Sequence, residues 1–182
     1  MTQLGSLGVF RMVLHFFTAF LLLLQAYVSP YFTVTPPHTA TGIVWATTTG
    51  VTTHVVDGDT IDVRLENSEV VRVRYIGMNS PEIYPTVECG GASSTARNHE
   101  LVGGKTVTLV PGPGLYDTYG RRLAYVYVGD TFVNETLVAE GWAELMMIPP
   151  NTSYRDSFEI LTTTARSKAA GIWTCSSHLL SR

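Results

Sequence analysis

The segment from Glu69 to Ile76 (EVVRVRYI) constrains the fold of this chain more tightly than any other. From Val71 on, basic and apolar residues alternate, which is the pattern of a β-strand with one face in a core and the other in solvent. Pro81 follows shortly afterwards and ends the strand, because proline cannot donate a backbone hydrogen bond to a sheet. We therefore expect a half-buried strand here, in a fold whose core is built from strands.

Patterns elsewhere predict a small β-rich domain. Residues 52–65 are rich in Val and Thr around the turn Asp57-Gly58-Asp59, which predicts two strands joined by a tight turn. Five strands with about three short helices predict an α+β fold, mainly β, built on a closed five-stranded barrel of the OB type. The other expected strands are Lys105–Val110 and Arg122–Val128, and the expected helices are Gly91–Val102, Asn134–Glu140 (capped by Asn134) and Ser153–Ala170 (capped by Ser153).

Apolar residues dominate the N-terminal segment. Met12 to Val28 is almost unbroken apolar sequence with Arg11 just before it. This pattern predicts an export signal in residues 1–30, either a cleaved signal peptide or an uncleaved signal anchor, and both alternatives stay open. A Thr- and Pro-containing linker (31–50), the folded domain (51–175) and a short tail (176–182) follow. We expect a secreted or extracytoplasmic protein that contacts a membrane only through its N-terminal segment.

The charge distribution limits how this chain can bind a polyanion. All 15 acidic residues and 11 of the 12 basic ones lie after residue 33, so this part carries a formal charge of about −4. Nonspecific affinity for nucleic acid comes largely from Lys and Arg that neutralise phosphates. Any binding to nucleic acid must therefore come from a local site or from a metal ion.

Cys89 and Cys175 are the chain's two cysteines. An even count in a chain with an export signal predicts one disulfide between them, which closes a long loop. The alternative is a pair of buried free thiols. Neither cysteine has a partner at metal-ligand spacing, so the sequence does not indicate a zinc site.

Oxygen-bearing side chains near two predicted turns suit a hard cation. Asp59 and Asn79 each offer one oxygen ligand of the kind that Ca²⁺ prefers. Pro81 favours an extended backbone at Ser80, which can present the Ser80 carbonyl as a third ligand. Each residue alone has an ordinary explanation, because DGDT is more often a plain turn.

Three charged side chains complete a set suited to phosphate chemistry. Glu82, three residues after Asn79, can take a proton from a water molecule. Arg74 and Arg121 can each donate paired hydrogen bonds to phosphate oxygens and offset the charge that develops at phosphorus. Together with the oxygen ligands, they indicate hydrolysis of a phosphodiester.

The combined pattern resembles the staphylococcal nuclease (thermonuclease) family. The resemblance extends from about Val51 to Trp173, with the motifs in the family's order and spacing. These motifs are DGDT, R-x-x-x-x-x-S-P-E from Arg74 to Glu82, D-x-Y-G-R from Asp117 to Arg121, LAYVYV, FVNETLVAEGWA and GIW.

The resemblance implies an OB-fold barrel with three helices and Ca²⁺-dependent hydrolysis of DNA and RNA. It implies a role for each matched residue. Asp59 and Asn79 occupy metal-ligand positions, Glu82 is the general base or the carboxylate that orients the water, Arg74 and Arg121 bind the phosphate, and Tyr119 lies near the phosphate of the bound nucleotide.

Three positions depart from the family's best-studied member. Asn79 replaces an aspartate, which keeps a carbonyl ligand but removes a negative charge, so we expect weaker metal affinity. Two tyrosines near the base align with Met147 and Pro149, which predicts reduced or different base contacts. A lysine beside the phosphate aligns with Thr118.

The leading hypothesis is a Ca²⁺-dependent endonuclease that acts on DNA and RNA, as a monomer without an obligate protein partner. The alternative is a nuclease-like barrel that binds nucleic acid or protein with little or no turnover. Glu82, Arg74 and Arg121 favour the enzyme, whereas Asn79 and the negative charge favour the binding module.

Overall fold

The computed structural model describes residues 46–175. The predicted export segment, most of the predicted linker and the predicted tail at 176–182 lie outside this range. Within residues 46–175, no helix combines the length and apolar character needed to span a membrane. The first strand begins at Thr48, so regular structure starts inside the segment predicted as linker and before the predicted boundary at Val51.

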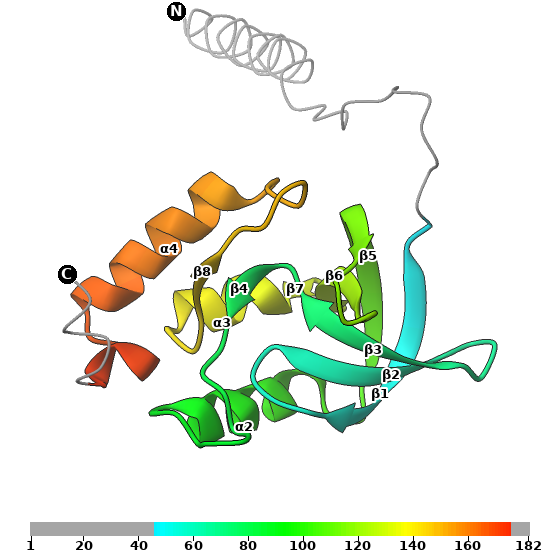
Figure 1. Cartoon of the computed structure of the whole chain (residues 1–182), viewed down its shortest axis with the longest axis horizontal. Coiled ribbons are helices and arrows are strands. Elements are labelled where there is room, and N and C mark those ends of the chain that lie inside the picture. Colours follow the sequence, from blue (N-terminus) through cyan, green and yellow to red (C-terminus); the bar gives the residue numbers. More distant parts are fainter. Residues whose placement is uncertain (1–45, 176–182) are drawn as a thin grey trace, which may run out of the picture. The chain divides into compact units, whose positions relative to one another are not determined.

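Five strands form the closed barrel that the sequence predicted (Figure 1). The sheet has the order β3-β2-β1-β5-β6, and a parallel pairing between β3 and β6 closes it. The short strand β7 (Thr131–Phe132) continues the sheet beyond β6. The barrel strands are β1 (Thr48–Val55), β2 (Thr60–Leu65), β3 (Val70–Tyr75), β5 (Thr106–Tyr116) and β6 (Arg122–Val128).

The alternation in β3 has the structural meaning that the sequence indicated. Val73 and Tyr75 are buried in the barrel core, whereas Arg72 is exposed on the other face. Arg72 forms an ion pair across to β2, with 2.8 Å between its Nε and Asp62 Oδ1. Arg74 shares the face of Arg72 but is half-buried, because it lies where β3 meets the next segment of the chain.

A second, two-stranded sheet and the helices form the rest of the domain (Figure 1). The first two α-helices contact barrel strands, whereas the last one packs on the helix and the short strand before it. Strands β4 (Gly77–Asn79) and β8 (Glu144–Met146) pair antiparallel. One apolar cluster unites the barrel interior with the helices, and it includes Val73, Leu109, Leu137 and Phe158. The helical elements are α2 (Gly91–Val102), α3 (Val133–Ala139), α4 (Arg155–Ser167) and the 3₁₀ helix η2 (Gly171–Thr174).

Several boundaries differ from the predictions. Strand β5 continues to Tyr116, well past the predicted end at Val110, with an irregularity in its pairing after Pro111 that accommodates the prolines. Helix α4 is shorter than predicted at both ends, and Tyr154, not Ser153, is its N-cap residue.

The predicted cap role of Asn134 was wrong. Phe132 is the N-cap residue of α3, and Asn134 is fully buried inside the helix. Its Oδ1 accepts from the Val126 N–H at 2.9 Å, and its Nδ2 donates to the Ile76 carbonyl at 3.0 Å. The side chain therefore satisfies two backbone groups of different barrel segments that water does not reach.

Cys89 and Cys175 form the predicted disulfide, which joins the segment before α2 to the segment after η2. The two residues are 86 positions apart in the sequence. Cross-linking so long a loop lowers the entropy of the unfolded chain, which stabilises the folded state by about 4–5 kcal/mol on a chain-entropy model.

Replacing both residues (Cys89→Ala/Cys175→Ala) should therefore lower the free energy of unfolding by about 4–5 kcal/mol, because the unfolded chain regains that entropy. Urea denaturation of the oxidised wild type and of the variant measures the difference. A loss below about 1 kcal/mol would contradict this account of the disulfide.

Candidate active site

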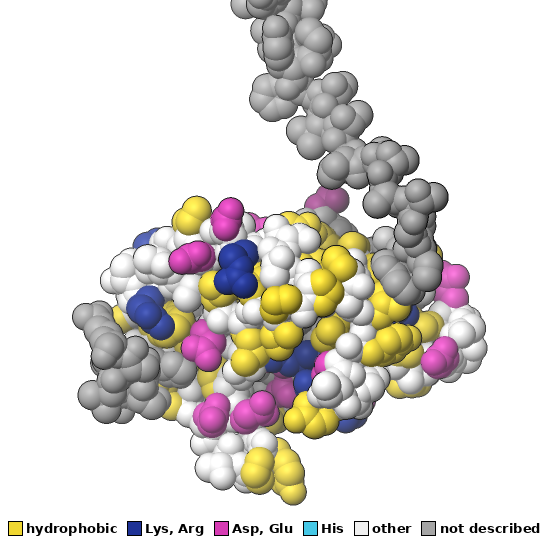
Figure 2. Space-filling model, turned by 45° about the horizontal axis from the view of Figure 1, so that its top comes forward, with side chains coloured by type: hydrophobic (Ala, Val, Ile, Leu, Met, Phe, Trp, Pro, Cys, Tyr) yellow, Lys and Arg dark blue, Asp and Glu magenta, His cyan; other side chains and the backbone are white. Residues whose placement is uncertain are grey.

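One cavity of about 280 Å³ brings together most of the predicted site residues. Its lining comes from the end of β3, from β4 and the segment after it, from the turn between β5 and β6 with the start of β6, and from the end of β8 with the segment after it. On the face shown in Figure 2, Lys and Arg side chains lie in a hollow bordered by hydrophobic and acidic side chains. The predicted residues that line the cavity are Arg74, Asn79, Glu82, Tyr119 and Arg121.

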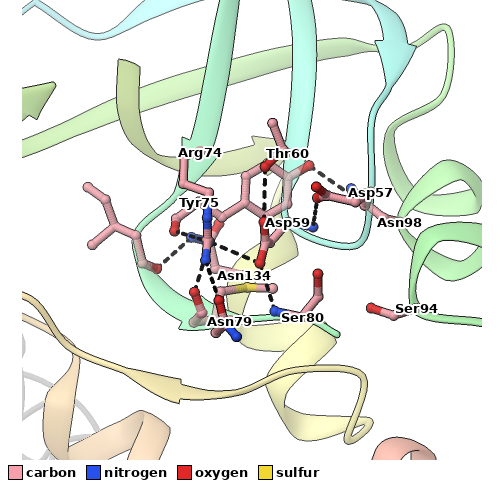
Figure 3. Close-up of polar contacts among 12 residues, drawn as sticks. Asp57, Asp59, Thr60, Arg74, Tyr75, Asn79, Ser80, Ser94, Asn98 and Asn134 are labelled. Atoms are coloured by element: carbon pink, nitrogen blue, oxygen red, sulfur yellow. Dashed lines mark hydrogen bonds and ion pairs between the residues drawn. The ribbon is translucent and has the colours of Figure 1, made fainter. Parts of the chain in front are cut away.

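Asp59 and Ser80 are not among the residues that line this cavity, and the Asp59 side chain is only 5% exposed. Figure 3 shows Asp59 next to Arg74, Thr60 and Ser80. Asp59 precedes β2, and its two carboxylate oxygens have different partners. Oδ1 accepts from the Thr60 hydroxyl at 3.0 Å, whereas Oδ2 accepts from the Ser80 backbone N–H at 2.7 Å. Asp59 therefore fixes Ser80, a residue 21 positions later, against the start of β2.

Arg74 connects Asp59 to Asn79. Its Nη1 lies 3.0 Å from Asp59 Oδ2 and donates to the carbonyls of Tyr75 and Met78 at 3.1 and 2.9 Å. Its Nη2 donates to Asn79 Oδ1 at 2.8 Å. The guanidinium group thus contacts oxygen atoms of both Asp59 and Asn79, the two side chains predicted to bind a cation.

Burial raises the pKa of Asp59 from 3.8 to about 6, although the nearby Arg74 guanidinium acts in the opposite direction. The neighbouring Asp57 carboxylate raises this pKa further. Asp57 also accepts the Asp59 backbone N–H through its Oδ1, at 2.9 Å. The sequence analysis treated Asp57 only as part of a turn, but it places a second negative charge beside Asp59.

Asn98 is a supporting residue that the sequence analysis did not identify. It lies on α2 and is fully buried. Its Nδ2 donates to the Asp57 carbonyl at 2.8 Å, and its Oδ1 accepts from the Tyr75 hydroxyl at 2.9 Å. Asn98 therefore links the turn before β2 to the end of β3, the two segments that position Asp59 and Arg74 (Figure 3).

Asp117 organises the turn that carries Tyr119 and Arg121. Its Oδ1 accepts the backbone N–H groups of Tyr119 and Arg121, each at 2.9 Å, and its Oδ2 lies 2.6 Å from Arg121 Nε. Gly120 has a φ of +78°, which favours glycine. Within residues 46–175, the Nη atoms of Arg121 donate no hydrogen bond to a protein group, and the guanidinium carbon lies 5.5 Å from the centroid of the Tyr119 ring. Both residues line the cavity.

Glu82 lies in the irregular segment between β4 and α2 and is exposed. In the described part of the chain, no group hydrogen-bonds its carboxylate, whereas its backbone N–H donates to Glu88 Oε2 at 2.9 Å. A carboxylate that lines the cavity without a protein partner can accept a hydrogen bond from water.

The apolar wall of the cavity differs from the alignment-based expectation. Met147 is half-buried and packs on the core, and Pro149 is not among the lining residues. Met146 and Ile148 line the cavity instead, and they are 43% and 65% exposed. The side chains that face a substrate here are therefore aliphatic, apart from the exposed Tyr119.

The donor set next to the cavity fits a hard cation. Asp59, the Asn79 amide oxygen and the Ser80 carbonyl are oxygen donors, and the Asp59 carboxylate is buried beside a second carboxylate, Asp57. Among the described residues, no cluster of three or more His, Cys, Asp or Glu side chains is arranged to hold a metal. The fit therefore depends on an amide and a backbone carbonyl, which carry no charge.

Comparisons with known proteins agree with this geometry. A family model described as "Staphylococcal nuclease homologue" matches residues 72–175. The chain is 38% identical over 132 residues to endonuclease YncB of Bacillus subtilis (strain 168), which covers 70% of this chain and 62% of that protein. It is 39% identical over 132 residues to the SPbeta prophage-derived endonuclease YokF of the same organism, covering 70% and 44%.

A further relative is the thermonuclease of Staphylococcus intermedius. The chain is 37% identical to it over 123 residues, which cover 65% of this chain and 72% of that protein. The chain thus spans less than two thirds of the two B. subtilis relatives but most of this one.

The raised pKa of Asp59 predicts how the stability of the metal-free protein depends on pH. Because the folded pKa of about 6 exceeds the value of 3.8 for a free aspartate, the charged carboxylate destabilises the folded state increasingly as pH rises from about 4 to 6. In a chelating buffer, the free energy of unfolding of Asp59→Asn should be close to that of wild type at pH 4. At pH 7.5 it should be higher than that of wild type by up to about 3 kcal/mol. Urea denaturation at both pH values tests this, and an equal difference at both would contradict it.

Proposed function

Because this chain belongs to the staphylococcal nuclease family, we propose that it is a Ca²⁺-dependent endonuclease that hydrolyses phosphodiester bonds of DNA and RNA. One observation carries the proposal: Glu82, whose carboxylate has no hydrogen-bond partner among the described residues, lines the same cavity as Arg74 and Arg121. A base and two phosphate-binding cations are the groups that this hydrolysis needs.

The two arginines, Arg74 and Arg121, interact with the phosphate in different ways. Asp117 binds Nε of Arg121, and no protein group within residues 46–175 hydrogen-bonds its Nη atoms, which suits paired hydrogen bonds to phosphate oxygens. Arg74 is already held by Asp59, Asn79 and two carbonyls, so it contributes a fixed positive charge next to the phosphate. A fixed charge stabilises the transition state without reorganising during the reaction.

Glu82 acts on the water. Its carboxylate accepts a hydrogen bond from the attacking water and takes or orients its proton as the oxygen approaches phosphorus. The wall formed by Met146 and Ile148 lets a sugar or base approach without specific hydrogen bonds, which supports action on both DNA and RNA.

The cation would be held by Asp59, the Asn79 amide oxygen and the Ser80 carbonyl. When bound, it supplies positive charge to the phosphate oxygens and so stabilises the charge that develops during hydrolysis. Arg74 contacts oxygen atoms of both Asp59 and Asn79, so its guanidinium group would compete with the cation for these ligands.

We also propose that the protein is exported. The disulfide between Cys89 and Cys175 supports this location, because structural disulfides persist in oxidising compartments. The apolar segment Met12–Val28 supplies the signal for export.

Removing the base or the phosphate ligand should abolish most cleavage. Glu82→Gln should lower kcat by about 10²–10⁴-fold because no carboxylate activates the water. Arg121→Ala should lower it by about 10²–10³-fold because a transition-state cation is lost. Cleavage of single-stranded DNA and of RNA with Ca²⁺, and after addition of a chelator, measures these effects.

Two exposed residues outside the cavity provide matched controls for this experiment. Glu69→Gln and Arg72→Ala remove the same charges from the β2–β3 hairpin and should leave kcat unchanged. Undiminished cleavage in Glu82→Gln would overturn the assignment. Binding of DNA without cleavage by wild type at any Ca²⁺ concentration would favour a binding module instead.

Restoring a negative charge at position 79 should strengthen cation binding. Asn79→Asp adds a second carboxylate to the proposed ligand set, so its Kd for Ca²⁺ should fall by about tenfold. Isothermal titration calorimetry measures this, with Asn67→Asp in the exposed turn after β2 as the charge-matched control. An unchanged Kd in Asn79→Asp would place the cation elsewhere.

A further inference from the structure

Glu82 and Glu88 hold each other across the segment between β4 and α2. The Glu82 N–H donates to Glu88 Oε2 at 2.9 Å, and the Glu88 N–H donates to the Glu82 carbonyl at 2.9 Å. These reciprocal bonds close residues 82–88 into a loop whose two ends meet beside the cavity. The Glu88 side chain thus contacts the backbone of Glu82, not its carboxylate.

The restraints on this loop lie near its two ends. Ile83 is half-buried, and a Cβ added at Gly91 would lie 2.6 Å from the Glu82 carbonyl oxygen, so the start of α2 packs on the backbone of Glu82. Residues 84–88 are all exposed, and the two largest apolar side chains among them, Tyr84 and Val87, are 83% and 65% exposed. Residues 82–88 belong to no helix or strand. A segment with so little buried apolar surface opens readily unless specific bonds hold it.

The far end of the loop is anchored to the C-terminal part of the domain. Cys89 is bonded to Cys175, which is only 5% exposed. A Cβ added at Gly90 would lie 2.8 Å from Ile172 Cγ2, so the backbone there is pressed against η2. The Gly91 N–H donates to the Glu88 carbonyl at 3.0 Å. Glu88 is therefore attached to a fixed part of the structure.

We propose that Glu88, anchored by the Cys89–Cys175 disulfide, is a positioning residue that holds the backbone of Glu82 so that its carboxylate stays in the cavity. This role rests on the proposed nuclease function. Glu88 does not line the cavity, so it acts only through Glu82. A displacement of about 1 Å in a reacting group can cost about 100-fold in rate, so a loosened Glu82 lowers kcat more than it alters substrate binding.

The test compares kcat and KM in a double-mutant cycle. Glu88→Ala should lower kcat about 10–100-fold with KM within about twofold of wild type. Glu88→Gln keeps a carbonyl acceptor for the Glu82 N–H and should retain most of the activity. In a Glu82→Gln background, Glu88→Ala should cause no further loss, because its effect passes through Glu82.

The anchor is tested in the same cycle. Cys89→Ala/Cys175→Ala should lower kcat, and combining it with Glu88→Ala should lower kcat by less than the product of the two separate losses. Exchange of the Glu82 amide hydrogen should accelerate in Glu88→Ala at a temperature where the variant remains folded. Glu69→Ala, which removes an equally exposed glutamate far from the cavity, should leave kcat and this exchange rate at their wild-type values.

Each outcome is decisive. A kcat in Glu88→Ala within twofold of wild type, or an equal loss in the Glu82→Gln background, would overturn the positioning role while leaving the nuclease function in place. Absence of cleavage by wild type under any metal condition would overturn the nuclease function and the positioning role together. If Glu88→Ala does not fold, the same cycle with Glu88→Gln decides, because a modest loss of kcat that disappears in the Glu82→Gln background supports the role and an additive loss contradicts it.

Discussion

The buried ion pair between Asp59 and Arg74 is the interaction on which the site depends. The Asp59 carboxylate contacts the side chain of Arg74 in β3 and the backbone of Ser80 after β4, and its own carbonyl accepts the Tyr75 N–H at 2.9 Å. Removing two charges from water costs several kcal/mol, and their mutual attraction offsets that cost only with good geometry and further hydrogen bonds. Here those bonds join three segments of the chain at one point.

The attraction between Asp59 and Arg74 does not fully offset the cost of burying the Asp59 carboxylate. Asp57 adds a second carboxylate beside Asp59, and burial still raises the pKa of Asp59 to about 6. A site optimised for stability alone would replace such a pair with apolar side chains. The negative charge of Asp57 and Asp59 instead lies next to a cavity that Arg74 and Arg121 line. This arrangement suits a cation bound between the protein and a phosphate. This local arrangement gives a chain with a net negative charge a site suited to a phosphate group.

The barrel and the charged residues at its edge could be predicted from sequence because each has a local signature. Alternation identified β3, and the Val- and Thr-rich segments on either side of Asp57 identified β1 and β2. The extension of β5 through Pro111 was missed, because proline argues against a strand unless the partner strand tolerates an irregular register, and that depends on β6. The pair β4–β8 was missed because its two strands are short and lie far apart in the sequence.

The supporting residues could not be predicted for a related reason. Asp57, Asn98 and Asp117 are residue types that are common in turns and helices. Asp57 and Asp117 belong to the motifs DGDT and D-x-Y-G-R, but the sequence does not show which groups they hold. Their roles come from contacts made in three dimensions, such as the distance of 41 positions between Asn98 and the Asp57 carbonyl that it holds. The motif D-x-Y-G-R was noted for its arginine and tyrosine, although its aspartate makes the hydrogen bonds that orient both. A motif can therefore identify the reacting groups without revealing which of its residues hold them in place.

The disulfide is a supporting group as well, because it lies next to the segment that carries a site residue. The barrel already has a continuous apolar core, whereas residues 84–88 are exposed throughout. A covalent bond at Cys89 stabilises the whole fold through the unfolded state, but its effect on local opening is greatest where few other contacts exist. Because this segment follows Glu82, the proposed positioning role gives one bond two effects, one on the stability of the domain and one on the geometry of the cavity. Buried hydrogen bonds hold Asp59 at the barrel, and the disulfide anchors the far end of the loop that begins at Glu82.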